Sequence, residues 1–333
     1  MVEVKVASPR RSPPRDGLQP TKLTRDLRAI AELIELCFGE RLERSDLAAV
    51  REMRAIGSLG PLLWLVGAFD TTGLGLGYVW LVDGRVVGNV STYRAGRGLR
   101  GMGQGWLIAN VAVHPDHRRR GVARALMEAT LESIVQRGGR WVILQLEHDN
   151  RGARALYEGL GFEEVGRLTQ WALARPPRVE QAAAMDSPSP RARRADEWQA
   201  EMALAARDRE TGLAWARPLE KSHFVHRWPD RLQDALNGKR RACWVVDDGL
   251  HLLGSLWVET SPLEIPRLTM LLEPSANQAE VGLRLVRHGL QGIRSRRQVK
   301  LESSDRDPAL AEGLAALGFQ ARRTLVQMKW SPK

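Results

Sequence analysis

Apolar positions in the first half of the chain alternate between helical spacing and strand spacing. Helical spacing predicts helices over residues 24–38, 43–56, 121–137 and 150–160. Apolar runs predict strands over 78–82, 86–90, 106–113 and 141–146, and a final strand pair within 162–174. A hairpin turning at Asp83-Gly84 precedes the alternating elements, and the Gly-rich stretch 95–105 is expected to be a loop. This order predicts an α/β fold with a mixed sheet.

The second half of the chain repeats the same order. Helices are expected over 196–210, 277–293 and 308–317, and strands over 242–246, 252–258, 268–272 and 299–301. Asp248-Gly249 marks a second hairpin, and Gly318-Phe319 stands where the first half has Gly161-Phe162. The two halves therefore indicate an internal duplication with a period of about 157 residues.

A segment without apolar periodicity separates the two halves. Residues 176–194 are rich in Pro, Ser and Arg, as interdomain linkers are. We therefore expect an N-terminal domain over 1–175 and a C-terminal domain over 195–333. The length of 333 residues suits two domains, since a domain has roughly 150 residues.

Composition excludes several classes of protein. Hydrophobic residues make up 43% and charged residues 27% of the chain, which excludes a wholly disordered protein. No apolar run approaches the roughly 18 residues of a membrane span, and no apolar stretch of a secretory signal follows the basic N-terminus. We therefore expect a cytoplasmic protein with no membrane partner.

Cys37 and Cys243 lack metal-ligand spacing, so we expect two core thiols, no metal and no disulfide framework.

The formal net charge of +11 raises the question of a nucleic-acid partner. The basic residues are spread along the whole chain and are mostly Arg. The sequence contains no recognition helix, zinc finger or aromatic RNA-binding signature. A solvated basic surface is the favoured interpretation, so nucleic acid is not the expected partner. The same positive field also suits a polyanionic cofactor.

The residues between the strand at 106–113 and the next helix carry the most informative pattern. The strand ends at Pro115, a basic turn follows, and the helix begins near Gly121. The first amides of a helix lack intrahelical partners and, together with the helix dipole, bind anions. Gly121 leaves room for a phosphate beside the backbone. A plain helix start with a solvated Arg run is the alternative interpretation of the same spacing.

Two blocks of sequence resemble the GNAT N-acetyltransferase superfamily. Arg118-Arg119-Arg120-Gly121-Val122-Ala123 resembles its (Arg/Gln)-x-x-Gly-x-(Gly/Ala) pyrophosphate loop. The segment from Asn150 to Phe162 resembles its Asn-x-x-Ala-x-x-x-Tyr-x-x-x-Gly-Phe block. The resemblance covers most of residues 20–175 and, with the duplication, implies two tandem GNAT-like acyl-CoA N-acyltransferase domains. It also implies acetyl-CoA as the co-substrate.

The resemblance implies roles for individual residues. The strand residues expected to lie along the pantetheine arm are Val111, Ala112 and Val113. The residues expected at the pyrophosphate are Arg118, Arg119, Arg120, Gly121, Val122, Ala123 and Arg124. Asn150 would contact the cofactor, and Tyr157 would be the general acid that protonates the departing thiolate, because a phenol with a pKa near ~10 keeps its proton at neutral pH. Glu147 is the candidate general base, with His148, His114 and a water chain as alternatives.

The second half departs from the family pattern where the chemistry lies. Aligning Pro274 with Pro115 puts Glu280 in place of Gly121, and a carboxylate there would repel a pyrophosphate. Aligning Gly318-Phe319 with Gly161-Phe162 puts Leu314 in place of Tyr157 and Asp307 in place of Asn150. We therefore expect a degenerate C-terminal copy that keeps the fold without binding acetyl-CoA.

The sequence thus predicts an enzyme that transfers an acetyl group from acetyl-CoA directly to a primary amine. The expected acceptor is a small molecule or a peptide, and the expected assembly is a monomer or a homodimer. The alternative is a non-catalytic regulator on the same fold that senses CoA or binds nucleic acid.

Overall fold

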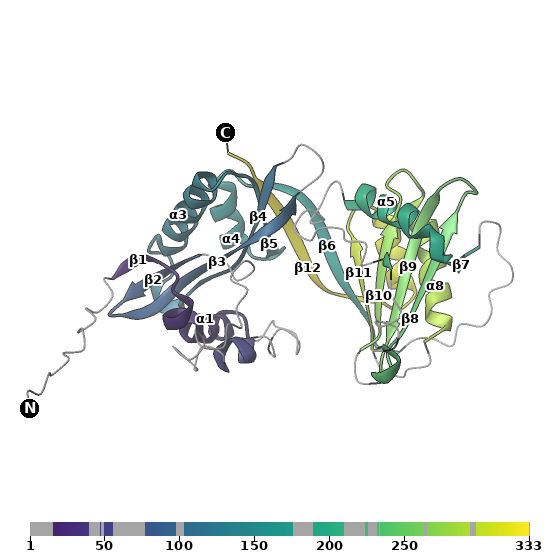
Figure 1. Cartoon of the computed structure of the whole chain (residues 1–333), viewed down its shortest axis with the longest axis horizontal. Coiled ribbons are helices and arrows are strands. Elements are labelled where there is room, and N and C mark those ends of the chain that lie inside the picture. Colours follow the sequence, from purple (N-terminus) through teal and green to yellow (C-terminus); the bar gives the residue numbers. More distant parts are fainter. Residues whose placement is uncertain are drawn as a thin grey trace, which may run out of the picture. The chain divides into compact units, whose positions relative to one another are not determined.

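The computed structural model describes residues 16–39, 47, 50–55, 77–97, 103–175, 189–209, 224–225, 232, 234–262, 265–293 and 298–332. Contacts divide the chain into two compact units (Figure 1). The first unit holds residues 1–94 and 106–142, and the second holds 95–105 and 143–331. Both units combine helices with strands, which confirms the predicted mixed α/β class. The domain boundaries expected from the sequence stay a prediction.

Strands of the first unit follow one another in chain order. Its elements are β1 (Gly17–Pro20), α1 (Leu23–Phe38), β2 (Tyr78–Val82), β3 (Arg85–Arg97), β4 (Gln104–Val113), a 3-10 turn (Pro115–His117) and α3 (Val122–Gln136). Residues 95–97 of β3 and 104–105 of β4 belong to the second unit, and the strand β5 (Gly139–Glu147) likewise has residues in both units. Asp83 and Gly84 have φ of 49° and 72°, which are the positive values that a tight two-residue hairpin requires. The predicted hairpin is therefore confirmed.

The segment 95–105, expected to be a loop, is partly extended. The strand β3 continues to Arg97 and β4 begins at Gln104. The Gln104 side-chain Nε2 donates to the Ala95 and Gly105 carbonyls, each at 2.9 Å. The bond to Ala95 joins β4 to β3 within the Gly-rich segment, so the loop prediction was wrong at both ends. Residues 98–102 lie outside the described residues.

Of the helix predicted over 43–56, only residues 47 and 50–55 are described, and they are helical.

A glycine lets a helix pack closely on the sheet in each half. A Cβ on Gly88 of β3 would lie 2.9 Å from Val122 Cγ1 of α3. A Cβ on Gly254 would likewise lie 2.8 Å from Val281 Cγ1. Protein interiors are close-packed, so such contacts leave no room for a methyl group. The same contact recurs between corresponding elements, as an internal duplication predicts.

The second unit contains the rest of the chain. Its elements are α4 (Arg151–Glu158), β6 (Glu163–Leu173), β7 (Arg191–Ala192), a 3-10 turn (Ala195–Glu197), α5 (Trp198–Arg209), β8 (Arg240–Asp247), β9 (Leu252–Thr260), β10 (Arg267–Leu272), α8 (Gln278–Gln291), β11 (Val299–Ser304), α9 (Pro308–Ala316) and β12 (Gln320–Trp330). The strands lie in the order β12-β6-β11-β10-β9-β8-β7. Only β10 and β11 are paired in parallel among the described pairings of this unit. The short strand β7 lies inside the segment expected to be a linker, and residues 176–188 lie outside the described residues.

The strand β6 belongs to the first half of the sequence but pairs with two strands of the second half. Trp171 pairs with Leu301 of β11 on one side, and Thr169 pairs with Thr324 of β12 on the other. The Trp171 indole donates to the Ser303 hydroxyl at 2.9 Å. A strand pair was predicted within 162–174, and that prediction was wrong, because one eleven-residue strand finds both partners far along the chain.

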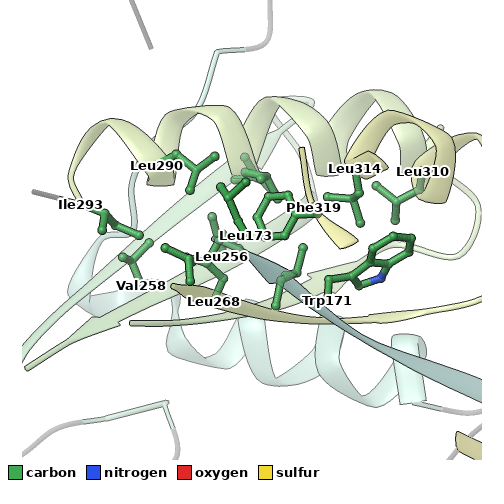
Figure 2. Close-up of a cluster of buried hydrophobic side chains, with 14 of the residues drawn as sticks. Trp171, Leu173, Leu256, Val258, Leu268, Leu290, Ile293, Leu310, Leu314 and Phe319 are labelled. Atoms are coloured by element: carbon green, nitrogen blue, oxygen red, sulfur yellow. The ribbon is translucent and has the colours of Figure 1, made fainter. Parts of the chain in front are cut away.

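A buried hydrophobic cluster of the second unit includes side chains of β6. Figure 2 shows Trp171 and Leu173 packed among residues of α8, α9, β9 and β10. Leu256, Leu268 and Leu314 are fully buried there, and burying a leucine side chain stabilises a fold by roughly 1.5–3 kcal/mol. The core of the second half therefore includes side chains from the first half of the sequence.

No helix in the described part of the chain has the length and apolar character to cross a bilayer.

Candidate functional site

The basic turn before α3 adopts a backbone that only certain residues accept. Arg119 has a φ of 59° and Gly121 a φ of 80°, both in the left-handed region where a side chain is strained. A Cβ on Gly121 would meet nothing within 4 Å. The space beside the Gly121 backbone is therefore open.

The backbone amides of this turn are free to bind a ligand. Among the described residues, the amides from Arg119 to Arg124 have no hydrogen-bond partner. The Ala125 amide is the first with one, and it donates to the Gly121 carbonyl at 3.0 Å. Such amides at a helix N-terminus attract anions. The geometry predicted for an anion site is therefore present at the predicted position.

The side chains of the turn differ in what they contact. Arg119 and Arg120 are exposed, whereas the Arg118 Nε donates back to the Val113 carbonyl at 3.0 Å. The Cys37 thiol lies 3.5 Å from the same carbonyl. Arg118 therefore links the turn to the end of β4, while its neighbours face solvent.

The strand β4 contains an irregularity that the sequence did not reveal. Asn110 has a φ of 54° in the middle of the strand, a conformation that Asn tolerates better than most residues. Its carbonyl accepts a 2.9 Å hydrogen bond from Nδ2 of Asn89, which is fully buried on β3. The irregularity directly precedes Val111, Ala112 and Val113, of which Ala112 is buried. An Asn within a β-strand pattern was the only available signal.

The other predicted site residues lie in the second unit. Asn150 is the N-cap of α4, where its Oδ1 accepts from the Ala153 amide at 3.1 Å. Tyr157 lies on the same helix, is 5% exposed and packs against the Phe162 ring. Burial raises the pKa of Tyr157 to about 12. Asn150 thus has a structural role, and its Nδ2 is free of hydrogen bonds among the described residues.

The candidate bases differ in their surroundings. Glu147 ends β5 and forms an ion pair with Arg323 of β12, whose Nε lies 3.0 Å from Oε1. His148 donates its backbone amide to the Thr324 carbonyl at 3.0 Å, and its side chain is exposed. The Nδ1 of His114 accepts from the Asp116 amide at 3.3 Å, so this side chain caps the 3-10 turn after β4. Glu147 is the one carboxylate among the three.

In the second half, side chains of the protein itself accept hydrogen bonds from backbone amides at the helix start that corresponds to the basic turn. The Ala279 amide donates to Asp307 Oδ2 at 2.9 Å, and the Glu280 amide donates to Asn277 Oδ1 at 3.2 Å. Leu314, which stands in place of Tyr157, is fully buried. Two of the amides that correspond to the free ones of the first half, those of Ala279 and Glu280, are therefore occupied. The described residues contain no group of three potential metal ligands, and Cys37 and Cys243 are free thiols.

Comparisons with known proteins agree with this geometry. Residues 27–162 match the Acetyltransferase (GNAT) family. A [Ribosomal protein bS18]-alanine N-acetyltransferase of Escherichia coli (strain K12) is 44% identical over 58 residues, which are 17% of this chain and 39% of that protein. An N-alpha-acetyltransferase 30 of Schizosaccharomyces pombe is 36% identical over 66 residues, which are 20% of this chain and 44% of that protein. The chain thus spans about two fifths of the length of each of these two relatives.

The fold is similar to a solved structure over nearly the whole chain. A GCN5-related N-acetyltransferase from Sphaerobacter thermophilus aligns with a TM-score of 0.59 over 94% of this chain and 95% of that one. Its sequence identity is 16%, so this likeness concerns the fold, and it extends over both halves of the duplication. The likeness to the Acetyltransferase (GNAT) family is carried by residues 27–162, the part of the chain that the family matches.

Proposed function

We propose that this protein transfers an acetyl group from acetyl-CoA to a primary amine. The observation that carries the proposal is the run of free amides from Arg119 to Arg124, opened by the positive φ of Gly121. A diphosphate needs several donors that converge without steric hindrance, and this turn supplies them at a helix N-terminus. The neighbouring arginines add a positive field for the same ligand.

The proposed chemistry assigns two proton transfers to two residues. Acetyl-CoA supplies an acetyl thioester when it is bound. Transfer forms a C–N bond and breaks the C–S bond, so the amine must lose a proton and the sulfur must gain one. We assign the first proton to Glu147 and the second to Tyr157. Burial raises the pKa of Tyr157 to about 12, so the phenol holds its proton at neutral pH.

The acceptor to test first is the α-amino group of a peptide. Two relatives are named as an alanine N-acetyltransferase of a ribosomal protein and as an N-alpha-acetyltransferase. Both names describe amines at the start of a protein chain. A panel of short peptides with different first residues, with a polyamine as the small-molecule alternative, covers the two acceptor classes expected from the sequence.

Two matched variants test the proposal. Gly121→Glu puts a carboxylate beside the free amides, whereas Gly138→Glu puts one at the other end of α3. Gly138 has a φ of 76° and, like Gly121, open space beside it, so both substitutions introduce similar backbone strain. Acetyl-CoA should raise the melting temperature of the wild type and of Gly138→Glu, and leave that of Gly121→Glu unchanged.

Release of free CoA thiol with the amine panel distinguishes an enzyme from a sensor. Thiol release that depends on amine, and that Gly121→Glu abolishes, is the expected result. A melting temperature that acetyl-CoA does not change in the wild type would contradict the proposed cofactor. A raised melting temperature without thiol release for any amine would favour the CoA-sensing alternative.

A further inference from the structure

We propose that β12, the last strand of the chain, positions the two residues to which we assign the proton transfers. In this proposal Arg323 is a positioning residue for Glu147, and Trp330 supports Tyr157 through Phe162. The inference rests on the proposed function. It gives the second half of the duplication a part in acetyl transfer although that half lacks the catalytic pattern.

The first observation is the ion pair between Arg323 and Glu147. Nε of Arg323 lies 3.0 Å from Oε1 of Glu147, and the two side chains are only 33% and 17% exposed. Partial burial reduces the screening of this pair by water. The Arg323 Nε forms no hydrogen bond among the described residues, so the contact is electrostatic, and a cation this close favours the Glu147 orientations that keep an oxygen beside it. Arg323 therefore restricts where the Glu147 oxygens point.

The second observation is an irregularity that places Arg323. Along β6, the paired residues step from Trp171 to Gln170, while along β12 they step from Ala321 to Arg323. Arg322 is thus an extra residue in β12 and is exposed. Such a bulge changes which side chains face each side of the sheet, since side chains alternate along a strand. The extra residue gives Arg323 the register position that Arg322 would otherwise hold.

The third observation is that backbone and side-chain bonds fix β12 next to Arg323. The Thr324 carbonyl accepts the His148 amide at 3.0 Å, directly after Glu147. The Thr324 hydroxyl lies 3.0 Å from the Thr169 hydroxyl of β6. The strand is therefore held on both sides at the level of the ion pair.

The fourth observation connects the other end of β12 to Tyr157. The Trp330 and Phe162 rings have centroids 6.5 Å apart, and the Phe162 and Tyr157 rings 5.8 Å apart. Gly161 has a φ of 88°, and a Cβ there would lie 3.7 Å from the Trp330 ring. Aromatic pairs at these separations favour particular relative orientations. Trp330 therefore limits the movement of Phe162, against which the Tyr157 ring packs.

A set of full-length variants tests the role of Arg323. Arg323→Met removes the charge but keeps much of the side-chain length, and it should lower kcat about 10- to 100-fold, because small displacements of a catalytic group cost this much. The KM for acetyl-CoA should stay unchanged, since the free amides at 119–124 lie in the other unit. Arg323→Lys should recover part of kcat, because it keeps the cation. Trp330→Leu should also lower kcat and leave the KM for acetyl-CoA at the wild-type value.

Arg322→Met is the matched control, since it removes the same charge one residue away. It should keep the wild-type kcat, because Arg322 is exposed and forms no ion pair among the described residues. The double variant Glu147→Gln with Arg323→Met should be no slower than Glu147→Gln alone, because Arg323 acts through Glu147. A merely structural Arg323 would instead slow both backgrounds by the same factor.

The outcomes separate this inference from the proposed function. Wild-type kcat in Arg323→Met, or equal slowing in both backgrounds of the cycle, overturns the inference while acetyl transfer by the wild type still stands. Absence of acetyl transfer by the wild type overturns both. If Arg323→Met melts below the assay temperature, the comparison of Arg323→Lys with Arg322→Met decides, and equal kcat in these two folded variants overturns the inference.

Discussion

Burial of the Tyr157 phenol determines both its proposed chemistry and its contribution to stability. The side chain is 5% exposed, and its hydroxyl forms no hydrogen bond among the described residues. Desolvation disfavours the charged phenolate, which is why the pKa of Tyr157 rises to about 12. The phenol therefore holds a proton to donate at neutral pH, but burial also makes it a weaker acid than a thiol with a pKa of about 8.5, so the proton transfer to the departing thiolate runs uphill.

The raised pKa of Tyr157 predicts a loss of stability at high pH. Between pH 10 and about 12 the folded state keeps the Tyr157 proton, while the unfolded state, with a pKa of 10.0, loses it. The unfolded state then binds fewer protons, so the free energy of unfolding falls by about 1.4 kcal/mol per pH unit in this range. Tyr157→Phe should remove this contribution to the pH dependence. Urea denaturation of both proteins at about pH 9, 10 and 11 would measure the difference.

Below pH 10 the two proteins should differ by a constant amount, because the phenol is then protonated in both states. An identical pH slope above pH 10 in the wild type and in Tyr157→Phe would contradict a buried neutral phenol. Tyr93, whose pKa burial also raises, is present in both proteins and cancels in the comparison.

At the scale of elements, local sequence patterns predicted most helices and strands. They did not predict which strands that are far apart in the sequence pair with each other. The helix α3, the hairpin at Asp83-Gly84 and the turn at Gly121 each depend on neighbouring residues, so the sequence contains their signals. The partners of β6 are β11 and β12, more than 100 residues away in the sequence. Apolar alternation shows that a strand exists but does not identify its partner.

The contact between Arg323 and Glu147 escaped prediction for the same reason. It depends on the position of β12 and on the extra residue Arg322. The Asn110 irregularity likewise depends on a tertiary contact, because the Asn89 amide that stabilises it comes from another strand. The residues of the candidate site could be predicted from motifs, whereas the residues that hold them in place could not.

The Asp307 carboxylate is expected to contribute to the free energy of unfolding, because it connects the starts of α8 and α9. Asp307 accepts the Ala309 amide of its own helix α9 at 3.0 Å and the Ala279 amide of α8 at 2.9 Å. Asp307→Asn keeps one acceptor oxygen and places an amide group at the other position, so one amide loses its partner. Loss of this bond should lower the free energy of unfolding by about 1–3 kcal/mol.

Asp305→Asn is the control for this change. It removes the same charge two residues earlier, where the side chain is exposed and has no partner among the described residues. Urea denaturation should show a change within about 0.5 kcal/mol for the control. Equal destabilisation by both substitutions would mean that net charge, rather than the bond between α8 and α9, is responsible.

At the scale of the whole molecule, the two halves of the duplication differ in how the amides at one helix start are used. In the first half, Gly121 opens the turn and the amides from Arg119 to Arg124 are free. In the second half, Asp307 and Asn277 accept hydrogen bonds from two of the corresponding amides. An anion would have to displace a carboxylate there, against the repulsion of like charges. We therefore expect the second copy not to bind a diphosphate, as the sequence predicted.

This difference predicts that each chain binds one CoA molecule although it contains two copies of the fold. Calorimetric titration of the full-length protein with CoA should give a stoichiometry of one per chain, and Gly121→Glu should abolish binding. If the second copy also bound CoA, the wild type would bind two molecules and Gly121→Glu would retain one. Binding retained in Gly121→Glu and lost in a variant of α8 would mean that the two copies have been assigned the wrong way round. Because the count concerns the chain itself, association of chains into dimers would leave the expected stoichiometry unchanged.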